Sequence, residues 1–173
     1  MVSVSVGDGG NRTSSVLPCR INPSSNIISL PQETIHAFIE TLEPLGFRIG
    51  YVGRGGEPDL PDHTHYRGDV IVSTSGTGEA TILRIVGADE DELRAILPTL
   101  HYFIHLENGE SIRIPLYPHD YINVSSVGRH FHQVLFAVAN SVRPFVIGSA
   151  LLSTLALHID PHRGRVGFAD PDI

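Results

Sequence analysis

The chain has 173 residues, of which 41% are hydrophobic and 18% are charged, a composition typical of a folded globular domain. Its formal net charge is −7 at pH 7, and it contains no run of Lys or Arg. Nucleic acids and anionic membranes bind basic patches that displace counterions, so we exclude both as partners. The apolar stretches are too short or too interrupted to span a bilayer.

Period-two alternation of apolar residues predicts strands along most of the chain. In chain order, strands are expected at residues 2–6, 81–86, 101–106, 111–116 and 155–159. Between the third and fourth of these, Asn108-Gly109 predicts a two-residue hairpin turn, because both residues accept positive φ angles. Ser73–Gly78 is also expected to be a hairpin turn, although its Gly and Ser content would suit an anion cradle. The sequence therefore predicts a mostly β protein.

Two segments have the pattern of helices. In Leu30–Leu42, Pro31 suits the first turn, and the apolar side chains at positions 35, 38, 39 and 42 form one stripe. In Asp89–Leu97, acidic residues occupy the first turn, where the helix dipole favours them, and Pro98 ends the run. Between the two helices, Gly53–Asp62 is too rich in Gly and Pro for regular structure, so we expect a surface loop there.

The single cysteine, Cys19, cannot form a disulfide within the chain, which fits a reducing compartment. The opening segment Met1–Gly7 alternates like a strand and lacks the charged and apolar regions of a signal peptide. We therefore expect a cytoplasmic protein. Two glycosylation sequons, Asn11-Arg12-Thr13 and Asn123-Val124-Ser125, keep a trimmed secreted protein as the alternative.

Four segments resemble, in order and approximate spacing, the carboxyl-terminal lobe of pepsin-like aspartic proteases. They are Cys19–Pro31, Leu97–His105, Ile112–Ile122 and Phe145–Ala169. The first is similar to the family's catalytic loop, Asp-Thr/Ser-Gly-Thr/Ser, followed by a short strand and by Leu-Pro at a helix start. The last is similar to an apolar-apolar-Gly-Asp segment with its short helix, strand, turn and closing Val-Gly-Phe-Ala.

The resemblance implies a single domain over residues 1–173, a pepsin-like acid-protease lobe of antiparallel, barrel-like sheets with two or three short helices. Residues 43–95 match nothing in the family, and we expect them to be a divergent or inserted segment. The family's amino-terminal lobe and its lobe disulfide have no counterpart in this sequence.

In the family, each lobe supplies one aspartate, and the pair shares a proton to activate a bound water. Here Asn22 stands at the aspartate position, and its amide does not ionise near neutral pH. Pro23 lacks a backbone N–H, and Ser24 brings a side chain to the position of the family's glycine, so only Ser25 fits the motif. The resemblance therefore implies the loss of proteolysis. A homodimer would pair Asn22 with Asn22, and a separate amino-terminal lobe would supply only one aspartate.

The chain contains ten histidines, and they include the pairs His63/His65, His101/His105 and His130/His132. Even spacing on a strand places both members of a pair on one face, where imidazoles can transfer protons near neutral pH. We name His130 and His132 as candidate catalytic residues. Solvated or hydrogen-bonded histidines are the alternative interpretation of each pair.

Arg129 and Phe131, which stand beside these two histidines, are candidate ligand-binding residues. No Cys–His or His-Glu-x-x-His pattern indicates zinc, so we expect no metal and no cofactor.

These observations predict a pseudoprotease whose former active-site face binds a small apolar ligand or a protein partner. We expect a homodimer through that face or a separate amino-terminal-lobe partner. The open face would be lined by Phe131, Phe136, Phe145 and Leu151, with core packing as the alternative for each. The alternative function is a non-proteolytic isomerase, cyclase or lyase that uses histidine acid/base chemistry. An inhibitor or scaffold without a pocket is a third interpretation, and the sequence leaves the ligand, any reaction and the oligomeric state open.

Overall fold

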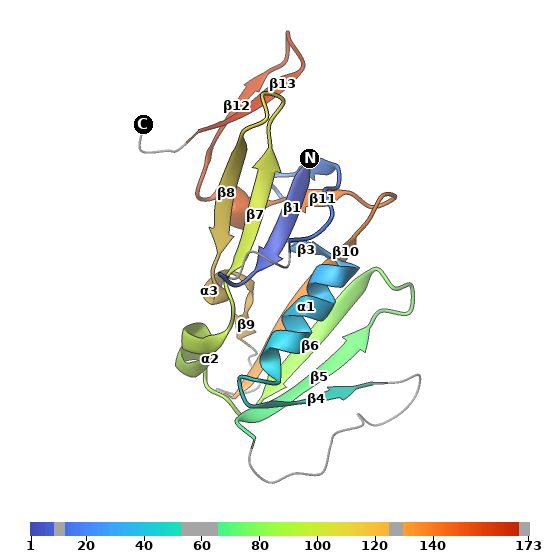
Figure 1. Ribbon diagram of the computed structural model, residues 1–173, viewed down its shortest axis with the longest axis vertical. Coiled ribbons are helices and arrows are strands. Elements are labelled where there is room, and N and C mark those ends of the chain that lie inside the picture. The colour runs from blue at the N-terminus through green and yellow to red at the C-terminus, as the bar shows by residue number, and fades with distance from the viewer. Residues whose placement is uncertain (9–12, 53–65, 125–129, 170–173) are drawn as a thin grey trace.

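Strands dominate the computed structural model, which describes residues 1–8, 13–52, 66–124 and 130–169 (Figure 1). The strands are β1 Val2–Val6, β2 Cys19–Ile21, β3 Ser29–Pro31, β4 Phe47–Tyr51, β5 Gly68–Thr74, β6 Ala80–Val86, β7 Leu100–His105, β8 Ser111–Leu116, β9 Asn123–Val124, β10 Phe131–Ala139, β11 Phe145–Ile147, β12 Ala156–Asp160 and β13 Arg165–Ala169. The helices of the described residues are α1 Gln32–Leu42, α2 Glu90–Ile96, α3 Pro118–Tyr121 and α4 Ser149–Leu152. The prediction of a mostly β protein is confirmed.

The strands of the described residues form four separate sheets. Antiparallel strands make a three-stranded sheet in the order β1-β7-β8, and a larger mixed sheet has the order β3-β10-β6-β5-β4, with β9 also on β10. β2 and β11 form a parallel pair, and β12 and β13 form an antiparallel hairpin. Figure 1 shows the β12–β13 hairpin at one end of the long axis, the three-stranded sheet in the middle and the larger sheet at the other end.

Helix α1 packs its apolar stripe against the larger sheet. Ile35, Phe38 and Leu42 are fully buried, and the Phe38 ring contacts those of Phe136 in β10 and Tyr121 in α3 at 5.2 and 5.6 Å between centroids. Burying each such side chain stabilises the fold by about 2 kcal/mol. The helix predicted over residues 30–42 is confirmed, although Pro31 is its N-cap in extended conformation rather than part of its first turn.

The β7–β8 hairpin forms at the predicted place with a different turn. Leu106 N donates to Glu110 O at 2.9 Å, and Gly109 N donates to Leu106 O at 3.1 Å. The turn therefore has three residues rather than the expected two, and only its last residue, Gly109, has positive φ, at +85°. This is the three-residue loop that ends in a glycine bulge. The turn expected near Ser73–Gly78 joins β5 and β6, as predicted.

Residues 43–95 contribute β4, β5, β6 and α2. β6 pairs with β10 from Phe131↔Val86 to Ala137↔Ala80, so this segment completes the larger sheet. The helix expected at 89–97 is confirmed as α2, with the Asp89 side chain accepting from Glu92 N at its start. The loop expected at Gly53–Asp62 lies outside the described residues.

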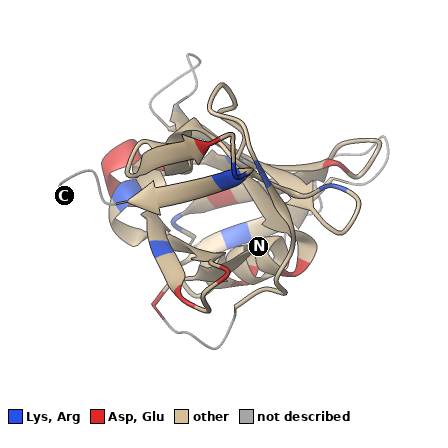
Figure 2. Ribbon diagram, turned by 90° about the horizontal axis from the view of Figure 1, so that it is seen from above, with Lys and Arg blue, Asp and Glu red and all other residues tan. Residues whose placement is uncertain are grey.

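Charged residues are dispersed over the fold. The basic residues of this chain are all Arg, and Figure 2 shows them interspersed with Asp and Glu on the described elements, rather than gathered on one face. Within the described residues, no helix is long and apolar enough to cross a membrane.

Candidate functional site

The parallel pair of β2 and β11 brings the Asn22–Ser25 loop against the start of α4. Cys19 lies opposite Phe145 and Ile21 opposite Ile147, and Asn22 N donates to Ile147 O at 3.0 Å just beyond the pair. Gly148 then leads into α4. A Cβ atom on Gly148 would lie 2.3 Å from the Ser25 carbonyl oxygen, so only glycine allows this approach.

Hydrogen bonds hold the loop in one conformation. Ser25 N donates to Asn22 O at 3.0 Å, and the Asn22 Oδ1 atom accepts from Ser24 N at 3.3 Å, as in an Asx turn. The Ser25 carbonyl accepts from Ser149 N at 2.7 Å and from Ser149 Oγ at 3.1 Å. The side-chain amide of Asn22 therefore stabilises the backbone turn in which Asn22 itself lies.

No acid or base of the loop is available for a shared proton. Residues 22–28 and 147–155 contain no Asp, Glu, His, Cys, Lys, Arg or Tyr. A dyad that activates water needs two ionisable groups in contact. The segments that meet at Ser25 cannot supply either one.

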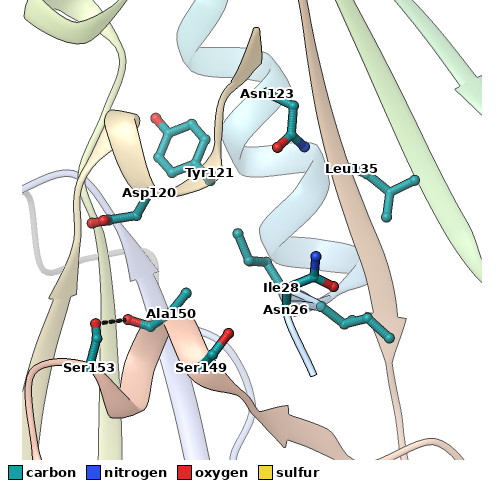
Figure 3. Close-up of a pocket in the computed structure, with 10 residues that line it drawn as sticks. Asn26, Ile28, Asp120, Tyr121, Asn123, Leu135, Ser149, Ala150 and Ser153 are labelled. Atoms are coloured by element: carbon teal, nitrogen blue, oxygen red, sulfur yellow. Dashed lines mark hydrogen bonds between the residues drawn. The ribbon is translucent and has the colours of Figure 1, made fainter. Parts of the chain in front are cut away.

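A cleft of ≈ 330 Å³ opens directly beside this loop, and we call it the Ser25 cleft (Figure 3). Its lining residues come from the segment after the loop, from α3 and β9, from β10 and from α4: Asn26, Ile27, Ile28, Asp120, Tyr121, Asn123, Leu135, Ser149, Ala150 and Ser153. Small-molecule sites are concave, with an apolar lining and a few polar groups that fix orientation. The Ser25 cleft mixes aliphatic side chains with serine hydroxyls and asparagine amides.

The alternation of β10 explains why Leu135 faces the cleft. The side chains of Val134 and Phe136 are fully buried, whereas Leu135 between them is 37% exposed. Successive strand residues point to opposite faces, so one face of β10 packs on the core while the other borders the cleft. Ala150 in α4 and Ser153 at the C-terminal end of that helix are small enough to leave the space opposite Leu135 open.

Asp120 is the one carboxyl residue of the described lining, and the sequence analysis did not identify it. Its Oδ2 atom accepts from Tyr117 N at 2.9 Å, which caps α3, and its Oδ1 atom lies 3.3 Å from His119 Nε2. Figure 3 shows its carboxylate directed away from Leu135. These contacts give Asp120 a structural role at the rim.

Tyr121 contributes its ring to the cleft, while its hydroxyl is hydrogen-bonded elsewhere. Its hydroxyl donates to Pro98 O at 2.7 Å, and burial raises the pKa of the Tyr121 phenol well above its usual range. The phenol therefore stays neutral at physiological pH.

The candidate residues around β10 do not meet at this cleft. His132 is fully buried, half-buried Phe131 precedes it, and His130 is exposed just before the strand. His132 and Leu135 are three positions apart, so they lie on opposite faces of β10. Neither histidine lines the Ser25 cleft. Arg129 lies outside the described residues.

Three of the four residues expected to line an open face are core residues. Phe136 and Phe145 are fully buried, and Leu151 is 4% exposed. The alternative interpretation, core packing, is therefore correct for these three, because each lies on the inward face of its element. The Ser25 cleft is lined instead by residues that no apolar pattern singled out.

The remaining described histidine pair, His101/His105, lies on one face of β7, as expected from the spacing. The His105 ring lies between Ser3 Oγ, 2.8 Å from Nε2, and Ser111 Oγ, 2.9 Å from Nδ1. His101 Nδ1 accepts from Arg113 Nε at 3.2 Å. Hydrogen bonding thus accounts for both ring nitrogens of His105, whereas His101 Nε2 is buried without a hydrogen bond, 3.3 Å from Asp8 Oδ1. Within the described part of the chain, no three His, Cys, Asp or Glu side chains gather as a metal site, and His63/His65 lie outside it.

No protein-family model and no curated protein matches this sequence. Its function is therefore inferred from the residues of the Ser25 cleft and their geometry.

Proposed function

We propose that this chain is a catalytically inactive lobe of the pepsin-like aspartic protease type that binds a small ligand in the Ser25 cleft. The ligand has an apolar body and a few hydrogen-bonding groups, because the lining combines Ile28, Leu135 and Ala150 with serine and asparagine side chains. This refines the small apolar ligand expected from the sequence.

The spatial relation of the resembling segments supports the proposal. The first and last segments, which are far apart in the sequence, meet through the β2–β11 pair. The Leu30-Pro31 dipeptide directly precedes α1, and the second and third segments form β7 and β8 of one hairpin. Segments that resemble one family also contact one another, which a chance resemblance would not require.

The single observation that carries the proposal is the Asn22–Ser25 loop itself. Its backbone is held by hydrogen bonds and by the close approach of Gly148, yet it carries no ionisable group. A rigid loop without a carboxylate beside a ligand-sized cleft favours binding over hydrolysis.

A screen of small metabolites by thermal unfolding, followed by methyl NMR, tests the proposal. A ligand that binds the folded state raises Tm by mass action. We expect hits to shift the methyl signals of Ile28, Leu135 and Ala150. The signal of Val142, which is 86% exposed and does not line the cleft, should stay unchanged. Hits that shift only methyls outside the cleft would refute the assignment.

A protein partner, a homodimer, a separate amino-terminal lobe and a cytoplasmic location stay predictions. So does the alternative of a histidine-dependent isomerase, cyclase or lyase. That alternative requires a substrate beside His130 or His132, and the Ser25 cleft borders the opposite face of β10 from His132.

A further inference from the structure

Strand β8 ends the three-stranded sheet, because the sheet order is β1-β7-β8 and no described strand pairs with its outer side. The hydrogen bond from Leu106 N to Glu110 O fixes Leu106 and Glu110 as a bonded pair. Bonded and non-bonded pairs alternate along an antiparallel ladder. The register His105↔Ser111 and Phe103↔Arg113 then makes Ser111 and Arg113 the residues whose N–H and C=O groups point outward from β8.

Pro115 agrees with this assignment. It lies opposite His101, two residues beyond Arg113, so its nitrogen also faces outward. Proline lacks an N–H and is tolerated in sheets at edge strands, where no ladder bond is lost. The outer side of β8 therefore offers the N–H groups of Ser111 and Arg113 and the carbonyl groups of Ser111, Arg113 and Pro115.

A groove of ≈ 510 Å³ runs along this edge, and we call it the β8 groove. One wall is four consecutive residues of β8, from Ile112 to Pro115, and the other wall is Thr154, Leu155, Phe168 and Ala169. Ile112, Leu155 and Phe168 are partly exposed. Apolar side chains of a bound molecule could therefore pack against these three residues. A linear molecule that follows the strand fits this shape better than a compact one.

Arg113 is the only charged residue of the described groove lining. Its Nε atom donates to a histidine nitrogen rather than to a carboxylate, and no described acidic side chain pairs with it. The groove thus presents a positive charge on a chain whose net charge is −7, which favours an acidic group in the occupant.

We propose that β8 is a strand-addition site for an extended peptide segment of a protein partner, with alternating apolar residues and a central acidic residue. Main-chain hydrogen bonds to a sheet edge supply affinity in this binding mode, and alternate side chains supply specificity. Residues opposite Ile112 and Ile114 share their face and are apolar. The residue opposite Arg113 shares the other face and is acidic. The proposal is independent of the function of the Ser25 cleft.

The register defines a probe, the fluorescein-labelled pentapeptide Thr-Val-Glu-Val-Thr, running antiparallel to β8. Fluorescence polarisation should show saturable binding to the wild-type chain, weakened about tenfold when Lys replaces the peptide Glu or when the Glu nitrogen is methylated. On the protein, Ser111→Pro removes an outward N–H and should also weaken binding about tenfold. Ser111→Ala is the control: it also removes the Ser111 hydroxyl but keeps the backbone N–H, so it should bind the peptide like the wild type.

Amide hydrogen exchange on the wild-type chain gives a second readout that does not depend on a variant's folding. The peptide should slow exchange at Ser111 and Arg113, while the inward amides of Ile112 and Ile114 are already protected in the free protein. Equal binding by the Pro and Ala variants, absence of saturable binding, or unchanged exchange at Ser111 and Arg113 would each overturn the proposal. A wild-type dimer that Ser111→Pro converts to monomer would also overturn it, since a second copy would then cover β8.

Discussion

Gly148 approaches Ser25 so closely that a Cβ atom on it would lie 2.3 Å from the Ser25 carbonyl oxygen. The neighbouring Ser149 donates to the same oxygen from its backbone N at 2.7 Å. These contacts join the start of α4 to the Asn22–Ser25 loop, in which Asn22 stands where the protease family that the sequence resembles has its aspartate. The shape of the Ser25 cleft depends on this contact, because Asn26 follows the loop and Ala150 follows Ser149.

Replacing Gly148 with Ala should destabilise the chain by about 2–3 kcal/mol, since the added methyl meets backbone rather than a side chain that could move. Denaturant unfolding measures the change. Gly76→Ala is the matched control, because nothing lies within 4 Å of its Cβ position, and it should be nearly neutral. Equal stability of the two variants would show that the Gly148–Ser25 approach is looser than described.

Alkaline pH should destabilise the fold through its two buried phenols. Burial raises the pKa of Tyr102 and Tyr121 well above the ordinary value of 10.0. The unfolded chain releases these protons first, so stability is full below pH 10 and falls as the pH rises above it. Unfolding midpoints in urea from pH 8 to 11 test this. Tyr102→Phe, which loses the hydrogen bond to Ser29 O, should be less stable at pH 8 yet lose less stability on going to pH 11.

The hydrogen bond of Glu33 should make a small contribution to folding stability, and this contribution should be lost at low pH. Its Oε1 atom accepts from Ser15 N at 3.0 Å, and this hydrogen bond lowers the pKa of the Glu33 carboxyl below its ordinary value of 4.5. The contribution is present above the unfolded-state pKa and is lost as the pH falls through the folded-state pKa. Because Glu33 is exposed, the effect should stay below about 1 kcal/mol.

Urea unfolding at pH 7 and pH 3 can isolate the Glu33 contribution. Glu33→Gln should lower stability at pH 7 and make little difference at pH 3. Glu107→Gln, at an exposed turn residue, is the control. A Glu33 deficit of the same size at both pH values would contradict the assigned cause.

Restoring the missing carboxylate should not restore proteolysis. Asn22→Asp introduces one acid beside segments that contain no second one, and a lone carboxylate cannot share a proton in the manner of a dyad. Hydrolysis of a fluorogenic peptide library from pH 3 to 6 should stay at background for the wild type and the variant. Cleavage by the variant alone would show that another group completes the site.

Local patterns predicted the elements whose period is unbroken. The stripe from Ile35 to Leu42 and the alternation of residues 101–106 and 111–116 each reflect a single buried face, so helix and hairpin followed from the sequence. The hairpin turn was wrong by one residue because Asn108-Gly109 suits both a two-residue turn and a three-residue turn with a glycine bulge.

Tertiary contacts decided what local patterns could not. β4 and β5 were not predicted, since they form by pairing in the large sheet, β5 with β6 and β4 with β5. The Ser25 cleft depends on contacts between α4, β10 and α3, and its residues Ala150 and Ser153 carry no signal of function in the sequence. His130 and His132 share a spacing but not an environment, because the strand begins between them.

Native mass spectrometry of the purified chain, before and after denaturation, tests the central claim most directly. The comparison includes Ser153→Phe, which places a large ring at the exposed rim of the cleft, and Ser141→Phe, the same change at an exposed residue away from it. We expect a small molecule that co-purifies with the wild type and with Ser141→Phe, is released on denaturation and is missing from Ser153→Phe. Equal occupancy of all three proteins, or no bound molecule in any of them, would contradict ligand binding in the Ser25 cleft.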